Sequence, residues 1–518
     1  MTMSNAAVQA QRIERQDQTM RVGASRPAPQ IRTVQENENK KKILFVTSEL
    51  SELIKTGGLG DVSAALPRAL RPHHDVRVLL PGYRQVMQSG HPIRLVGSLA
   101  GHAALPGGRI GRIDLDDGLI VYVLISPELY ERDGGPYGDN RNQDWPDNHI
   151  RFARLGLAAA DFAAGEAGIS WRPDLIHAHD WPAGLAPAYL RWRGQRTPSV
   201  FTIHNLAYQG LWRPECRAEL AIPAEACRME RMEFHGQLSF LKAGIAYADR
   251  ITTVSATYAR EITTPDFGCG LEGFLREKAE HGLLCGIPNG IDESWEPETD
   301  AHLLRNFGVN DWEGKAVHAE HVRRQFALEP SGSSGPLFVV VSRLVQQKGL
   351  DLTHALAETL VAHGGQLAVL GRGEPAVEDS MRQLAERFPG RVGVNIGFEE
   401  TVARRMFAGA DFLLMPSRYE PCGLSQLYAQ RFGSLPVARK TGGLADTIED
   451  GVTGFLFEEP SLDSYREALL RAFRVFATPS LFHAMRCRAM AVPCFWRQTI
   501  DPYLRLYRQV LESRHGEA

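Results

Sequence analysis

The sequence predicts an α/β protein with two Rossmann-like, doubly wound domains that face each other across a cleft. At 518 residues the chain is longer than one ordinary domain, which favours two or more. Short, continuous apolar runs alternate with helical stretches, and this alternation is typical of a parallel sheet covered by helices. The alternation occurs twice, and its second series opens at Pro336. Hydrophobic residues make up 43% and charged residues 23% of the chain, a balance typical of globular proteins with large cores.

The first series begins abruptly at Lys42, after a polar N-terminal stretch. The run Ile43–Thr47 is short and apolar throughout, as expected for a strand that is buried on both faces. Ala-rich and Leu-rich stretches predict helices at 151–164 and 183–191. The predicted strands of this series are 43–47, 76–80, 119–124, 174–177, 200–203 and 250–254.

The second series follows a turn at 286–290, where we place the connection between the domains. Residues 292–328 are then predicted to form the opening helices of the second domain. The predicted domains are therefore 42–287 and 288–488, preceded by a disordered tail at 1–41. The predicted strands of this series are 336–341, 366–370, 392–396, 411–415, 435–438 and 454–457.

Composition also excludes several classes of partner. The net charge of −3 provides no basic field for nucleic acid or an anionic membrane surface. No apolar run reaches the roughly 18 residues of a membrane helix, and the N-terminus lacks the apolar stretch of a secretory signal. An odd number of scattered cysteines without a C-x-x-C pair indicates a reduced, cytoplasmic protein. These cysteines are Cys216, Cys227, Cys269, Cys285, Cys422, Cys487 and Cys494.

Two loops that follow strands are candidates for binding phosphate. Lys55, Gly57 and Gly58 come after the first strand, where paired glycines let backbone amides approach an anion at a helix N-terminus. Arg343 and Lys348 follow the first strand of the second series, and their charges suit a departing diphosphate. A plain strand-to-helix turn and two solvated cations are the structural alternatives. Neither loop is a Walker A or G-x-G-x-x-G sequence, so neither ATP nor NAD follows.

The densest group of candidates lies at 416–426, after a very apolar strand. Pro and Gly residues set a rigid turn there, and the helix from Leu424 offers its N-terminal amides. Glu420 is placed to hold sugar hydroxyls, whereas Cys422 is interpreted as a small buried residue. Nearby, the segment 440–446 repeats the pattern of the Lys55 loop.

Three histidines, His177, His179 and His204, follow strands of the first series. A His-x-His pair suggests a metal, but a third ligand at a suitable spacing is missing, so hydrogen-bonded histidines are the favoured interpretation. The acidic segment 114–118 resembles a manganese pair of sugar transferases, yet its position between two apolar runs favours a hairpin turn.

Taken together, the motifs resemble those of bacterial and plant glycogen and starch synthases, which are retaining glycosyltransferases of the GT-B fold. The resemblance covers residues 42 to about 511. Each motif is weak alone, but their order and spacing are specific. They are KTGGLGDV, PYGDNRNQDWPDN, HAHDW, TIHNLAYQG, TTVSATYAREI, GIPNGID, VSRLVQQKG, PSRYEPCGLSQLYA and KTGGLADTIEDG.

The resemblance implies a reaction and a set of roles. It implies transfer of glucose from ADP-glucose to the non-reducing end of an α-1,4-glucan. It also implies that the first domain binds the acceptor, that the second domain binds the nucleotide sugar, and that a C-terminal helix, 489–518, completes the first domain. The implied catalytic residues are Arg343, Lys348, Glu420 and His204. The implied donor-binding residues are Lys55, Gly57, Gly58, Asp61, Asn289, Gly423, Leu424 and Thr441. The implied acceptor and supporting residues are Tyr137, Asp139, Asp180, Trp181 and Asn205.

We expect no metal, nucleic acid or membrane to take part. We expect cations to stabilise the leaving diphosphate electrostatically. Because Glu420 is interpreted as a hydroxyl ligand, we expect same-face attack by the acceptor. Because Lys55 and Arg343 belong to different domains, we expect domain closure. The alternatives are a related transferase that uses UDP-glucose, a non-catalytic glucan-binding protein and an NAD-dependent dehydrogenase. Tyr428 counts against the UDP-glucose transferase, and the presence of Arg343, Lys348, Lys55 and Glu420 counts against the non-catalytic protein. The missing dinucleotide fingerprint counts against the dehydrogenase.

Overall fold

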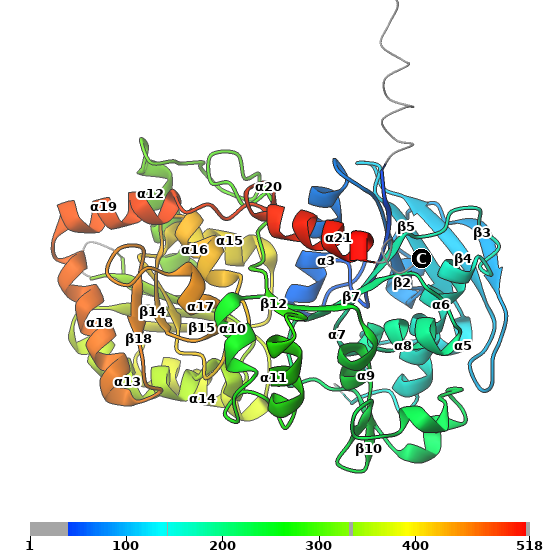
Figure 1. Cartoon of the computed structure of the whole chain (residues 1–518). Helices are drawn as coiled ribbons and strands as arrows, with labels where there is room; N and C mark the ends of the chain where they lie inside the picture. Colours follow the sequence, from blue (N-terminus) through cyan, green and yellow to red (C-terminus); the bar gives the residue numbers. More distant parts are fainter. Residues whose placement is uncertain (1–39, 142, 331–334, 514–518) are drawn as a thin grey trace, which may run out of the picture. The chain divides into compact units, whose positions relative to one another are not determined.

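A computed structural model describes residues 40–141, 143–330 and 335–513. All but two residues of the predicted tail, 1–41, lie outside these ranges. The described chain is organised around two large sheets, which define a first and a second lobe (Figure 1). No helix in the described ranges is long and apolar enough to cross a membrane.

The sheet of the first lobe has nine strands in the order β12-β11-β7-β6-β1-β2-β5-β4-β3. From β12 to β5 all neighbours are parallel, and β3 and β4 add an antiparallel edge. Four residues of β1, Ile43–Val46, are fully buried, which explains why an unbroken apolar run forms this central strand. The strands are β1 (Lys42–Val46), β2 (Asp75–Pro81), β3 (Arg94–Leu99), β4 (Gly108–Asp114), β5 (Ile120–Ile125), β6 (Leu175–His179), β7 (Ser199–Ile203), β11 (Arg250–Thr253) and β12 (Leu284–Gly286).

The helices of this lobe include α6, α8 and α9, which pack side by side (Figure 1). A small antiparallel sheet, β8-β10-β9, lies in the long connection between β7 and α9. Its strands are Leu211–Trp212, Gln237–Ser239 and Glu233–Phe234. The helices are α3 (Gly58–Leu70), α4 (Arg84–Met87), α5 (Pro127–Tyr130), α6 (Asn148–Ala164), α7 (Asp180–Ala183), α8 (Leu185–Trp192), η1 (Pro214–Arg217), η2 (Ala224–Ala226), α9 (Phe240–Tyr247), α10 (Ala256–Glu261) and α11 (Glu272–Glu280).

The sheet of the second lobe has six parallel strands in the order β15-β14-β13-β16-β17-β18. Side chains of β13 alternate between two cores: Val339 faces one and Val340 the other. Helices therefore cover both faces of this sheet, as in doubly wound folds. The strands are β13 (Leu337–Val341), β14 (Gln366–Gly371), β15 (Val392–Ile396), β16 (Phe412–Met415), β17 (Leu435–Arg439) and β18 (Phe455–Phe457).

Two α-helices from the end of the chain, α20 and α21, return to the first lobe. Trp496, Tyr503 and Tyr507 belong to its core, and the Tyr507 hydroxyl lies 2.7 Å from Nδ1 of His177. The helices of the second lobe and the C-terminus are α12 (Glu313–Gln325), η4 (Gln346–Lys348), α13 (Leu350–Ala362), α14 (Pro375–Arg387), α15 (Glu400–Gly409), α16 (Ser425–Arg431), α17 (Gly442–Thr447), α18 (Leu462–Phe476), α19 (Pro479–Met490), α20 (Trp496–Thr499) and α21 (Asp501–Ser513).

Two sequence predictions have clear outcomes here. The hairpin at 114–118 is confirmed, because β4 and β5 are antiparallel and the Leu115 amide donates to Leu119 at 3.0 Å. The prediction that 292–328 forms opening helices is wrong for its first part, since only Glu313–Gln325 is an α-helix. The preceding segment is held in turns by buried Arg404, which donates to the Ser294 carbonyl at 2.7 Å and to Asp300 at 2.8 Å.

Candidate active site

Each lobe has a topological switch point at which its polar loops converge. Numbered along the chain, the strands of the second sheet have the order 3-2-1-4-5-6. The first sheet, apart from its edge strands β3, β4 and β12, has the same order when it is read from β5 to β11. The switch points therefore fall between β1 and β6 and between β13 and β16. Ligands of doubly wound sheets bind at the carboxyl ends of these strands.

The second-lobe switch point gathers Arg343, Lys348 and Glu420. Lys348 Nζ lies 2.5 Å from Oε2 of Glu420, and the Ser417 hydroxyl donates to the same oxygen at 2.9 Å. Glu420 is only 6% exposed, so this buried carboxylate is compensated by one cation and one hydroxyl.

Arg343 has a different environment. Its guanidinium donates to the Tyr208 hydroxyl of the first lobe at 3.2 Å and to the Gln347 amide oxygen at 3.3 Å. Both acceptors are neutral, and Arg343 forms no ion pair with any residue that the structure describes. Its positive charge is therefore available to an anionic ligand.

At the first-lobe switch point, a buried carboxylate organises the loop after β1. Glu49 accepts hydrogen bonds from the Thr56 amide at 2.6 Å, the Gly57 amide at 3.0 Å and the Tyr137 hydroxyl at 2.7 Å. Burial raises the pKa of Glu49, against the opposing effect of these bonds. One of the two glycine amides predicted for phosphate binding is thus already occupied, while Gly58 begins α3, whose first amides have no intrahelical acceptor.

Lys55 is paired with Asp61, at 2.7 Å from its Oδ1. Lys55 also lies 5.8 Å from the ring centroid of Phe398, a side chain that is 62% exposed. Sequence reasoning missed Phe398, although its position just after β15, at the carboxyl edge of the sheet, was a usable signal.

The two lobes meet at the glycine turns. A Cβ added to Gly58 would lie 3.6 Å from Leu424, so the Lys55 loop lies against the turn Gly423–Leu424 of the second lobe. In the second KTGG loop, the Thr441 hydroxyl and the Gly442 amide donate to Glu261 of the first lobe at 2.9 and 3.0 Å. Asn289, which is 6% exposed, contacts Cys422, and burial raises the pKa of that thiol to about 12. A protonated, buried thiol fits the interpretation of Cys422 as a packing residue.

His204, Asn205 and Asp180 form one hydrogen-bonded unit after β6 and β7. Asp180 Oδ1 accepts from the His204 amide at 2.7 Å and the Asn205 amide at 3.3 Å. Burial raises the pKa of Asp180 to about 7 and lowers that of His204 to about 3. His204 Nε2 lies 3.0 Å from Nδ1 of His179, so Nδ1 of the neutral His204 ring remains available to another hydrogen-bond partner.

The predicted acceptor residues lie in two environments. Tyr137 and Trp181 pack with ring centroids 6.0 Å apart, and the Tyr137 hydroxyl ties this segment to Glu49. Asp139 is partly exposed, and its Oδ1 accepts from the amides of Arg141 at 2.8 Å and Gln143 at 3.0 Å. Asp139 therefore stabilises its own turn.

Two doubly wound lobes, each with cationic residues at its switch point, are the arrangement of the GT-B fold. The structure is similar to the catalytic domain of starch synthase IV from Arabidopsis thaliana, solved with ADP and acarbose bound, at a TM-score of 0.82 and 29% identity over 92% of this chain and 100% of that one. Sucrose-phosphate synthase from Thermosynechococcus elongatus shares the fold, at a TM-score of 0.57 and 18% identity over 92% of this chain and 100% of that one. The predicted fold class is confirmed.

Sequence comparison defines the family. Residues 42–277 match the starch synthase catalytic domain, and residues 323–474 match the glycosyl transferases group 1 family. The chain is 67% identical to glycogen synthase of Pseudomonas fluorescens over 96% of both chains. It is 68% identical to that of Pseudomonas putida and 60% identical to that of Pseudomonas aeruginosa, each over 92% of both chains. The chain belongs to the glycogen synthase family.

Proposed function

We propose that the chain transfers glucose from ADP-glucose to the non-reducing end of an α-1,4-glucan, with retention of configuration. The observation that carries the proposal is Arg343, a cation without a carboxylate partner beside the Lys348–Glu420 pair. Relatives named glycogen synthase and a similar plant enzyme solved with ADP and acarbose support this donor and acceptor. The unpaired cysteines among the described residues support a cytoplasmic location.

The cations at the site differ in how much charge they offer to a diphosphate. Lys348 is paired with Glu420 and Lys55 with Asp61, so part of each positive charge is already compensated. Among the described residues, Arg343 donates hydrogen bonds only to neutral groups and forms no ion pair, and a guanidinium can bind two phosphate oxygens at once. We therefore assign stabilisation of the leaving diphosphate mainly to Arg343, with Lys348, Lys55 and the Gly58 amide in support. We propose that these charges stabilise the leaving diphosphate without a metal ion.

Glu420 is proposed to bind glucose hydroxyls rather than to attack the anomeric carbon. One of its oxygens already accepts two hydrogen bonds, one of them from an ammonium, which lowers its nucleophilicity. We therefore propose same-face attack, in which the departing diphosphate takes the proton of the acceptor hydroxyl. A glucosyl ester trapped on Glu420 and identified by mass spectrometry would overturn this assignment.

We propose three further roles, each supported by the geometry. Neutral His204 offers Nδ1 as a hydrogen-bonding group beside the sugar, and Asp180 fixes the backbone of His204 and Asn205 by accepting from both amides. The exposed ring of Phe398, next to Lys55, offers a stacking surface for the adenine base. Tyr137 and Trp181 offer aromatic faces to the sugar rings of the acceptor.

The test is glucose incorporation into a glycogen primer, with ADP-glucose and UDP-glucose compared side by side without added metal. We expect transfer from ADP-glucose. Preferred use of UDP-glucose would contradict the donor assignment while keeping the reaction class. Glucan binding without transfer from either donor would overturn the proposal in favour of a non-catalytic glucan-binding protein.

A further inference from the structure

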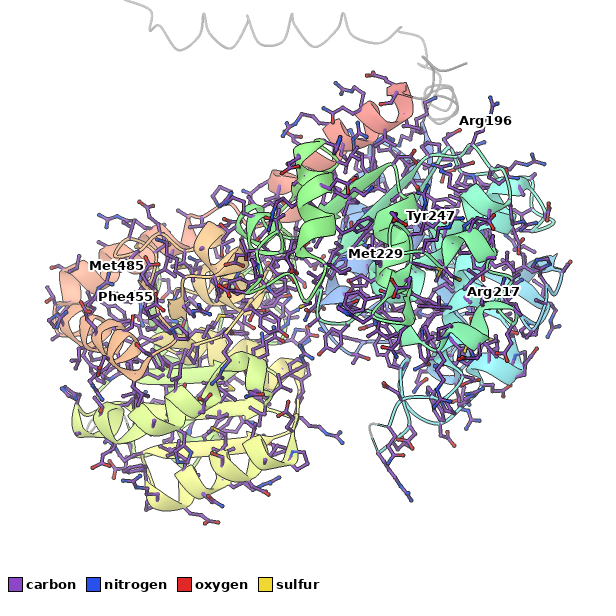
Figure 2. All side chains as sticks on the ribbon, turned by 60° about the horizontal axis from the view of Figure 1, so that its bottom comes forward. Arg196, Arg217, Met229, Tyr247, Phe455 and Met485 are labelled. Atoms are coloured by element: carbon purple, nitrogen blue, oxygen red, sulfur yellow. The ribbon has the colours of Figure 1, made fainter. Side chains whose placement is uncertain are left out.

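Away from the two switch points, three metal-ligating side chains converge on the first lobe. They are His149 at the start of α6, Cys216 in the turn η1 and Glu219 just after that turn. One ligand atom from each lies within 4.8 Å of the other two. Arg217, which follows Cys216 directly, is labelled in Figure 2 and marks this turn. Nothing in the glucosyl transfer reaction uses these side chains.

The hydrogen bonding of His149 is incomplete for a mostly buried imidazole. Its side chain is 13% exposed, and Nδ1 is buried without a partner among the described residues. Nε2 has only a 3.4 Å contact with Oε2 of Glu219, which is longer than a normal N–H···O bond. Nε2, the nitrogen that faces Glu219, therefore lacks a hydrogen bond of normal length and is available to a metal, while Nδ1 would carry the proton of the neutral imidazole.

We propose that His149, Cys216 and Glu219 bind a zinc ion, which fastens the η1 turn to helix α6. Imidazole, thiolate and carboxylate are the ligands that zinc accepts in proteins, and three of them leave a fourth position for water. In a tetrahedral zinc site the ligand atoms are about 3.3–3.6 Å apart. Closing from separations of at most 4.8 Å requires a shift of no more than about 1.5 Å, which Glu219 can supply because its side chain is 53% exposed.

Binding also involves a proton balance. Zinc binds the thiolate, so the Cys216 thiol releases one proton to solvent as the Zn–S bond forms. Burial raises the pKa of Cys216, and the nearby Glu219 carboxylate raises it further. Because the thiol must lose its proton, higher pH favours zinc binding, as it does at any thiolate site.

The location gives the site a structural consequence. The His149 ring lies 5.3 Å from the ring of Trp212 in β8, and Trp212 lies 6.4 Å from Trp181. The residue before His149, Asn148, donates to the Tyr137 carbonyl at 2.7 Å. A metal here would tie together the two segments that support the aromatic acceptor residues.

The experiment is titration of the full, metal-stripped chain with cobalt(II) as a spectroscopic substitute for zinc. We expect one high-affinity ion per chain and a thiolate-to-cobalt charge-transfer absorption band. Zinc should displace cobalt and raise the thermal unfolding temperature. The band should be lost in Cys216→Ser and kept in Cys487→Ser, the matched control, whose thiol lies 3.6 Å from His483 without a third ligand in the part of the chain that the structure describes.

Glu219→Gln gives a second test that does not depend on the fold of the cysteine variant, since this side chain is exposed. We expect it to weaken cobalt affinity at least tenfold while the chain stays folded. Absence of the charge-transfer band in the parent chain would overturn the proposal. An unchanged band in Cys216→Ser, or unchanged affinity in Glu219→Gln, would do the same.

Discussion

Replacing Arg343 with alanine tests the proposed chemistry with little effect on the fold. Arg343 is exposed, and its two hydrogen bonds go to the neutral groups of Tyr208 and Gln347. Loss of such surface contacts changes the free energy of unfolding by about 0.5 kcal/mol or less. Loss of a cation aimed at the leaving diphosphate should raise the activation free energy by about 2.7–4 kcal/mol, which corresponds to about a 100- to 1,000-fold fall in kcat.

The assay is steady-state incorporation of glucose from ADP-glucose, with thermal unfolding measured on the same samples. Arg343→Lys should recover part of the activity, because it restores the charge without the planar fork. Arg382→Ala on α14 is the matched control, because Arg382 pairs only with the carboxylates of its own helix, Glu378 and Asp379. Near-normal kcat in Arg343→Ala, with an unchanged unfolding temperature, would refute the assignment of Arg343.

Three further outcomes are expected. Lys348→Ala should reduce kcat about 100-fold or more. It should also lower the free energy of unfolding, measured by denaturant titration, by about 3–5 kcal/mol, because the buried Glu420 carboxylate loses its cation. Lys348→Met combined with Glu420→Gln should recover stability but not activity. Phe398→Ala should raise KM for ADP-glucose about tenfold with little change in unfolding temperature, and equal KM values would exclude stacking of the base. Asp180→Asn should flatten the pH dependence of the free energy of unfolding. The folded pKa of about 7 lies above the usual value of 3.8, so the stabilisation by protonated Asp180 is complete below about pH 4 and is lost as the pH rises to 7, at up to about 1.4 kcal/mol per pH unit. Parallel curves of unfolding free energy against pH for parent and variant across this window would contradict this prediction.

The sequence was most informative where burial dictates composition. All twelve predicted strands correspond to strands of the two large sheets, because a strand covered on both faces must be apolar throughout, as β1 and β13 are. Strands β3 and β4, which form the antiparallel edge, and β12, at the opposite edge, were missed, as were β8, β9 and β10, which have only two or three residues each. Such strands depend on their neighbours rather than on their own composition.

Site residues could be predicted where they follow a strand directly, as Arg343 and His204 do. Contacts between distant segments could not. The Glu261 carboxylate that binds Thr441 comes from 180 residues earlier in the chain, and no local pattern indicates it. Tyr208, which binds Arg343 from the other lobe, was missed for the same reason.

The two KTGG loops differ in which lobe supplies the hydrogen-bond acceptor for the amide of their first glycine. This difference determines what separation of the lobes would do to each loop. In each loop the amide of the first glycine donates to a buried or half-buried glutamate, because amides at a helix start need an acceptor. For the loop of Gly57 the acceptor is Glu49 of the same lobe. For the loop of Gly442 the acceptor is Glu261 of the first lobe, with a second link from Thr257 to Asp446 at 2.6 Å. Opening of the lobes would therefore leave the first loop assembled but would expose the amide of the second, so closure and completion of the second-lobe loop are coupled.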